Sequence, residues 1–119
     1  MIRVAVDAMG GDFGPDVIVE GVVEALRDIP VRAILVGDEP RVLASLKRLG
    51  KVPDAGEIVH ASDVVAMGAH PVEAVKRQKD SSIVVACRLV KEGRADAVVS
   101  AGSTGAAMAS SLLQWGRVK

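Results

Sequence analysis

Aromatic side chains, cysteines and net charge are all scarce in this chain of 119 residues. Phe13 and Trp115 are its only residues of the Phe, Tyr and Trp class, and 15 basic residues balance 15 acidic ones. Nucleic-acid binding calls for stacking rings and excess positive charge, so we expect no nucleic acid as a partner. The single cysteine, Cys87, excludes an internal disulfide, and its apolar surroundings are typical of a buried thiol and not of a nucleophile.

Targeting and membrane-spanning patterns are also missing. The first residues, "MIRVAVDA", resemble neither a signal peptide nor a transit peptide, so we expect a cytoplasmic protein. Residues 97–116 carry no charge, but they are rich in Gly, Ser and Thr. That composition favours a buried strand, loop and helix over a bilayer span.

What the chain does contain is an alternation of short apolar runs with helical patterns. The runs are almost continuously apolar, which is typical of parallel strands covered on both faces. The strands are expected at 2–8, 31–37, 57–61 and 95–101. Helices are expected from Pro15 to about 29 and at 40–49, 71–79, 81–92 and 104–115. This alternation predicts an α/β fold with a mainly parallel sheet and helices on both sides.

The chain ends directly after the last predicted helix, with no closing strand. We therefore expect residues 1–119 to be the N-terminal part of a single α/β/α catalytic domain whose remainder lies outside this sequence. Ligands of such sheets bind at the carboxyl ends of the strands, which directs attention to the strand-to-helix loops.

The loop "SAGSTGAAM" follows the fourth strand and opens the last helix. Gly102 and Gly105 allow backbone amides to approach an anion, Ser103 and Thr104 add hydroxyl donors, and no acid follows in the chain. This pattern predicts a phosphate-binding loop. The alternative, of equal weight, is that a hydroxyl caps the helix and the glycines allow close packing.

A second candidate is "KRQKDSSIVV", in which three cations precede Ser81 and Ser82 at a helix start. The two serines are candidate phosphate ligands. A capped helix that follows a solvated basic face is the favoured alternative.

The stretch "DAMGGDFGPD" leaves the first strand. Gly10 and Gly11 offer backbone donors and are candidate phosphate-binding residues, but Asp7 and Asp12 flank them and would repel an anion. We expect the two acids to be catalytic residues that orient a base, a lysine or a partner loop. The alternative is an Asx-type turn into the helix. The groups that Gly10 and Gly11 contact are expected outside this chain.

Metal and dinucleotide sites are not predicted. His60, Asp63 and His70 match no compact ligand spacing, and the first strand lacks the Gly-x-Gly-x-x-Gly fingerprint. Asp38, at the end of the second strand, is a candidate helix N-cap.

Together, "VAVDAMGGDFGP", "LVGD", "KDSS", "LVKEGRADA" and "VSAGSTGA" resemble the bacterial phosphate acyltransferase family, PlsX, in the same order and at similar spacing. The resemblance covers essentially the whole chain but only about the N-terminal third of a family member. It implies an enzyme that moves a long-chain fatty acyl group from acyl carrier protein to inorganic phosphate, giving acyl phosphate for phospholipid biosynthesis. It also implies a three-layer α/β/α sandwich like those of phosphotransacetylases and isocitrate dehydrogenases, a homodimer, peripheral membrane association and no cofactor.

One residue departs from the family pattern. The family usually has Asn at the position of Ser103, and Ser lacks the paired donor and acceptor of the amide. Two other functions remain open: a phosphotransacetylase-like enzyme that uses coenzyme A thioesters, and a non-catalytic anion-binding module. We expect this fragment by itself to be inactive.

Overall fold

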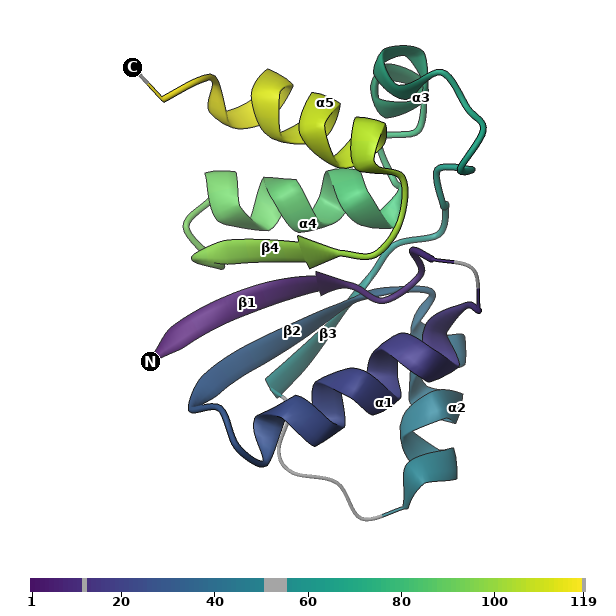
Figure 1. Ribbon diagram of the computed structural model, residues 1–119, viewed down its shortest axis with the longest axis vertical. Coiled ribbons are helices and arrows are strands. Elements are labelled where there is room, and N and C mark those ends of the chain that lie inside the picture. The colour runs from purple at the N-terminus through teal and green to yellow at the C-terminus, as the bar shows by residue number, and fades with distance from the viewer. Residues whose placement is uncertain (12, 51–55, 119) are drawn as a thin grey trace.

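Four parallel strands form one sheet in the computed structural model, which describes residues 1–11, 13–50 and 56–118 (Figure 1). They are β1 (Ile2–Asp7), β2 (Val31–Gly37), β3 (Gly56–His60) and β4 (Ala97–Ser100). Their order across the sheet is β3-β2-β1-β4, and every pairing is parallel. All four carboxyl ends therefore lie along one edge, as predicted for an α/β fold.

Helices cover both faces of this sheet (Figure 1). One face carries α1 (Pro15–Leu26) and α2 (Glu39–Leu49). The other face carries α4 (Ser82–Lys91). Helix α5 (Thr104–Trp115) packs on α4, and α3 (Pro71–Arg77) packs against α5. Pro15 begins α1, where its missing N–H costs no hydrogen bond, and Gly50 ends α2 with φ of 76°.

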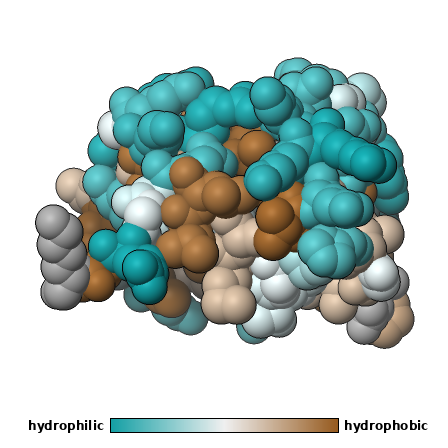
Figure 2. Space-filling view, turned by 90° about the horizontal axis from the view of Figure 1, so that it is seen from above, coloured by the Kyte–Doolittle hydropathy of each residue, from teal (hydrophilic) through white to brown (hydrophobic). Residues whose placement is uncertain are grey.

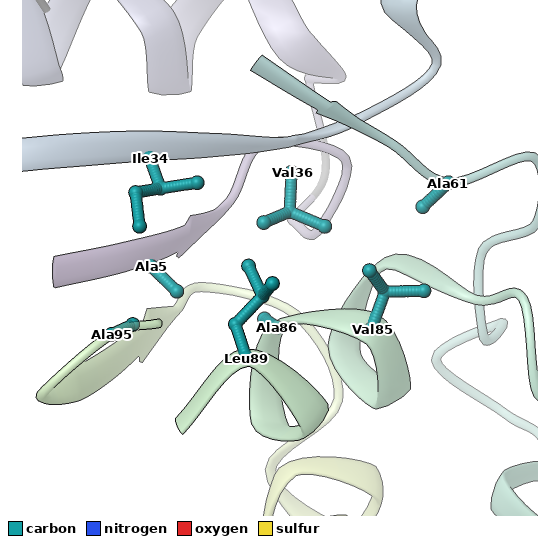
Figure 3. Close-up of a cluster of buried hydrophobic side chains, with 8 residues drawn as sticks. All are labelled: Ala5, Ile34, Val36, Ala61, Val85, Ala86, Leu89 and Ala95. Carbon is teal, nitrogen blue, oxygen red and sulfur yellow. The ribbon is translucent and has the colours of Figure 1, made fainter. Parts of the chain in front are cut away.

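The core explains why the strands are apolar on both faces. Ala5 and Val36 point toward α4, where they meet Val85, Ala86 and Leu89 (Figure 3). The intervening strand residues point the other way and pack against α1 and α2; these are Val6 and Leu35, with Val19, Val23 and Val42 from the helices. Alternation along a strand thus buries consecutive side chains in different layers.

Apolar surface remains exposed around β4 and α5. A groove of about 460 Å³ lies between α1 and the β1–β4 side of the sheet, where Val99 is 55% exposed. A cleft of about 600 Å³ lies on the opposite face, between β4, α4 and α5. On α5 itself, Met108, Leu112 and Leu113 are exposed, and Figure 2 shows hydrophobic side chains gathered on this side of the molecule. Within the described ranges, no helix has the length and apolar character that crossing a membrane requires.

Two local predictions have different outcomes. Cys87 is fully buried, as predicted. Asp38 occupies the N-cap position of α2, but its side chain makes no capping hydrogen bond. The backbone N–H of Glu39 instead donates to Nδ1 of His60, 3.1 Å away at the end of β3. The cap is a long-range contact between neighbouring loops, which sequence spacing does not indicate.

Candidate functional site at the carboxyl edge of the sheet

Asp7, the last residue of β1, is a buried carboxylate with both oxygens engaged. Its side chain is on the α4 face, and the residue is 3% exposed. Oδ1 accepts the backbone N–H groups of Met9 and Gly10, each at 3.1 Å. The bond to Met9, two residues along, is the Asx-type turn considered from the sequence. Asp7 therefore organises its own loop, and the geometry shows no carboxylate oxygen directed at solvent.

Ser100, the last residue of β4, holds the other oxygen of Asp7. The two residues are register partners on adjacent strands. The hydroxyl of Ser100 donates to Oδ2 of Asp7 at 2.9 Å and accepts the backbone N–H of Gly102 at 3.1 Å. Sequence reasoning missed Ser100, although a polar residue that closes an apolar strand at the ligand-binding edge is a usable signal.

The loops after β1 and β4 also touch directly through their glycines. A Cβ atom on Gly10 would lie 2.7 Å from the backbone nitrogen of Gly102 and 2.9 Å from Oδ2 of Asp7. The expectation that Gly10 contacts groups outside this chain is therefore wrong, because its neighbour is another loop of the same sheet edge. Gly11 has φ of 97°, a left-handed conformation that favours glycine.

The start of α5 combines a cap with an open loop. The hydroxyl of Ser103 accepts the N–H of Ala106 at 3.2 Å, so Ser103 is the N-cap. Asn is an equally good capping residue, and the departure from the family pattern leaves this function intact. The capping leaves the first two helical amides, those of Thr104 and Gly105, for solvent or a ligand. Thr104 is exposed, and no acidic residue lies in the first turn.

Gly105 has a packing role. A Cβ atom there would lie 2.6 Å from Cγ of Pro71, which begins α3. For this residue the structure supports the packing alternative, whereas the phosphate-binding roles of Gly102, Ser103, Thr104 and Gly105 stay predictions.

Ser81 and Ser82 lie at the start of α4 but are covered. They are 0% and 1% exposed. The Ser81 hydroxyl has no hydrogen-bond partner in the part of the chain that the structure describes. Direct contact with phosphate would require a neighbouring element to move, so the structure adds no support to this prediction.

Two further points complete the set of predicted residues. Asp12, the second predicted catalytic acid, lies outside the described residues. Among residues 1–11, 13–50 and 56–118, no group of three or more His, Cys, Asp or Glu side chains is arranged to hold a metal ion.

An ion pair joins β1 to the segment before β4 at the opposite edge of the sheet. The Arg3 guanidinium donates to both carboxylate oxygens of Asp96, at 3.1 and 3.2 Å, and the Arg3 backbone N–H donates to Oδ2 at 2.8 Å. These hydrogen bonds from Arg3 lower the pKa of Asp96, and the same side-chain hydrogen bond raises the pKa of Arg3.

Comparison with known proteins shows the family to which this chain belongs. The model of the fatty acid synthesis protein family matches residues 2–119. Proteins named phosphate acyltransferase are 56% identical over 119 residues in Desulfitobacterium hafniense (strain Y51) and 52% identical over 117 residues in Gloeothece citriformis (strain PCC 7424). These matches cover 100% and 98% of this chain but 35% and 33% of the relatives. The chain therefore spans about a third of the length of the relatives it matches, and it belongs to the fatty acid synthesis protein family.

Proposed function

We propose that this chain is part of an acyltransferase that moves a long-chain fatty acyl group from acyl carrier protein to inorganic phosphate. The observation that carries the proposal is the start of α5, where Thr104 is exposed and the first turn has no acidic side chain, in a chain whose relatives are named phosphate acyltransferase. The amino end of a helix attracts anions through its unpaired N–H groups and its partial positive charge.

In the proposed reaction, a phosphate oxygen attacks the carbonyl carbon of the acyl thioester. A C–O bond forms, the C–S bond breaks, and the carrier thiolate leaves and takes up a proton. The negative charge on the tetrahedral intermediate requires N–H or O–H donors. We assign phosphate binding to the amides of Thr104 and Gly105, the first two residues of α5, and to the hydroxyl of the exposed Thr104.

The rest of the catalytic apparatus is proposed to lie in the further length that the relatives carry. Both oxygens of Asp7 are engaged within the protein, so we do not assign this residue as the general base. We expect the isolated 119-residue chain to bind phosphate weakly and to form no acyl phosphate.

A chimera tests the proposal. This chain replaces the matched stretch of the Desulfitobacterium hafniense (strain Y51) phosphate acyltransferase, to which it is 56% identical. The chimera is supplied with inorganic phosphate and either acyl carrier protein thioesters or coenzyme A thioesters, and acyl phosphate is measured. We expect product from the carrier-protein thioester.

A second chimera is the control for incompatible junctions, with the matched stretch taken from the Gloeothece citriformis relative. Activity in the control and none with this chain would refute the proposal and favour a non-catalytic anion-binding module. Product from coenzyme A thioesters alone would favour a phosphotransacetylase-like enzyme.

Thr104 offers a site-specific test because its exposure separates ligand binding from folding. Replacing it by Val keeps the shape and removes the hydroxyl. A hydrogen bond to a charged group contributes about 1.5–3 kcal/mol, so we expect the KM for phosphate to rise at least about tenfold in Thr104→Val. Thr104→Ser, which keeps the hydroxyl, should stay near the parent. An unchanged KM in Thr104→Val would remove this residue from the phosphate site.

The proposal also includes a cytoplasmic homodimer that associates peripherally with the membrane. Sedimentation of the active chimera is expected to give the mass of two copies. Flotation with phospholipid vesicles is expected to recover a salt-sensitive fraction of it. A monomeric mass or complete absence from the vesicle fraction would remove the corresponding part of the proposal.

A further inference from the structure

We propose that Ser100 is a positioning residue for phosphate, and that it acts by fastening the loop before α5 to the buried carboxylate of Asp7. The identity of the ligand, phosphate, rests on the proposed function. The role of Ser100 rests on the hydrogen bonds among the described residues.

The donors and acceptors of the Ser100 hydroxyl have only one arrangement. The backbone N–H of Gly102 can only donate, so Ser100 Oγ accepts from it at 3.1 Å. The single hydroxyl hydrogen then points to Oδ2 of Asp7 at 2.9 Å. The two bonds form a chain from the loop after β4, through Ser100, to the last residue of β1. Hydrogen bonds in such a chain polarise one another.

Asp7 is suited to anchor these two hydrogen bonds because its own side chain is held in place. Its other oxygen accepts two backbone N–H groups, and the residue is 3% exposed. A buried carboxylate is costly unless donors surround it, and here Ser100 supplies one of three. Loss of the Ser100 hydroxyl would therefore leave Oδ2 of Asp7 and the N–H of Gly102 without their partner.

Gly102, the residue held by Ser100, lies shortly before the amides that we assign to phosphate binding. Gly102 precedes the N-cap Ser103, and the first two helical amides, which have no partner within a helix, follow at Thr104 and Gly105. Gly102 is thus held both by close packing against Gly10 and by its hydrogen bond to Ser100. Donors held in place before the ligand arrives bind it without the cost of ordering them. Ser100 and Asp7 thus contribute to phosphate binding without touching the phosphate.

Substitution of Ser100 separates this role from general stability. In the active chimera, Ser100→Ala is expected to raise the KM for phosphate about tenfold, because the loop that carries Gly102 must then be ordered when phosphate binds. The KM for the acyl thioester should not change. Ser100→Thr keeps the hydroxyl and should restore the parent value. Ser111→Ala is the matched control, because Ser111 is also partly buried but donates to the Ala107 carbonyl within α5.

Amide hydrogen exchange of the 119-residue chain provides a second measurement that does not depend on activity. Ser100→Ala should accelerate exchange of the Gly102 amide about tenfold or more, whereas Ser100→Thr and Ser111→Ala should leave it near the parent rate. If the parent chimera is inactive, the proposed function fails, and exchange at Gly102 still decides whether Ser100 fastens the loop.

Three outcomes would overturn the inference. The first is an unchanged phosphate KM in an active, folded Ser100→Ala chimera. The second is an equal rise in the KM for both substrates, which would indicate a general loss of structure. The third is exchange at Gly102 that does not respond to Ser100→Ala. A selective rise in the phosphate KM, with rescue by Thr, would support it.

Discussion

Replacement of Gly10 by Ala should destabilise the protein through one identifiable contact. The new Cβ atom would lie 2.7 Å from the backbone nitrogen of Gly102, about 0.7 Å inside the 3.4 Å at which ordinary contact begins. It would also lie 2.9 Å from Oδ2 of Asp7. Neither neighbour is the end of a flexible side chain, because one is backbone and the other is held by Ser100. The two loops must therefore move apart.

The size of the effect follows from two terms. Overpacking costs about 1–3 kcal/mol, and weakening a hydrogen bond to the buried carboxylate costs up to about 1.5–3 kcal/mol more. We therefore expect the free energy of unfolding to fall by roughly 3 kcal/mol, a large part of the ~5–15 kcal/mol typical of a domain. The corresponding fall in Tm is roughly 10 °C.

Gly21 provides the matched control for Gly10. It lies inside α1, is exposed, and has no atom within 4 Å of an added Cβ. Gly21→Ala should therefore stabilise the chain by about 0.5–1 kcal/mol, because Ala has the higher helix propensity. Urea unfolding followed by far-UV circular dichroism and by the fluorescence of Trp115 measures both variants. A Gly10→Ala protein within about 0.5 kcal/mol of the parent would refute the described contact between the loops.

Three other substitutions test separate contacts. Gly105→Ala should cost about 1–3 kcal/mol in urea unfolding, because its Cβ would lie 2.6 Å from Pro71; equal stability would mean that α3 moves freely from α5. Ser103→Ala should cost about 1 kcal/mol through loss of the α5 cap and Ser103→Asn should cost little, so equal losses would contradict the capping role. Arg3 lowers the pKa of Asp96, so this carboxylate stabilises the fold above its unfolded pKa of about 3.9. That contribution to stability is lost as the pH falls through the lower folded pKa. Asp96→Asn should therefore reduce the acid dependence of stability in that window, and an unchanged pH profile would contradict the ion pair.

The elements could be predicted from the sequence because each has local signals. Near-continuous runs of Val, Ile and Ala predicted the strands, and glycine or proline marked several helix boundaries; the predicted strand 31–37 coincides with β2. The first helix ends at Leu26, before the predicted limit of about 29, because the carbonyl groups of Glu24 and Ala25 bond the amides of residues 27 and 28 in a closing turn. Propensity alone does not set such a boundary.

The site could be predicted only in part, because its central contacts join distant loops. Asp7, Gly10 and Gly102 were identified, but Ser100 was missed, and the contacts of Asp7 and Gly10 with Ser100 and Gly102 join residues more than 90 positions apart. These residues meet only because β4 pairs with β1, and strand order does not follow from the periodicity of one sequence. The same reason explains the His60 contact at α2, where a neighbouring strand supplies the acceptor that Asp38 was expected to provide.

The pairing of β4 with β1 is secured by side chains at both of its ends, and this links the stability of a short strand to the proposed site. Asp96 binds Arg3 at the amino ends, and Ser100 binds Asp7 at the carboxyl ends. Both pairs depend on one register, since a slip of one residue would turn Ser100 toward the α1 face. β4 has only four residues, and Val99 is largely exposed, so burial alone holds it weakly. The two side-chain pairs therefore keep the loop before α5 opposite Gly10. Weakening the Arg3–Asp96 pair should for this reason also accelerate hydrogen exchange of the Gly102 amide.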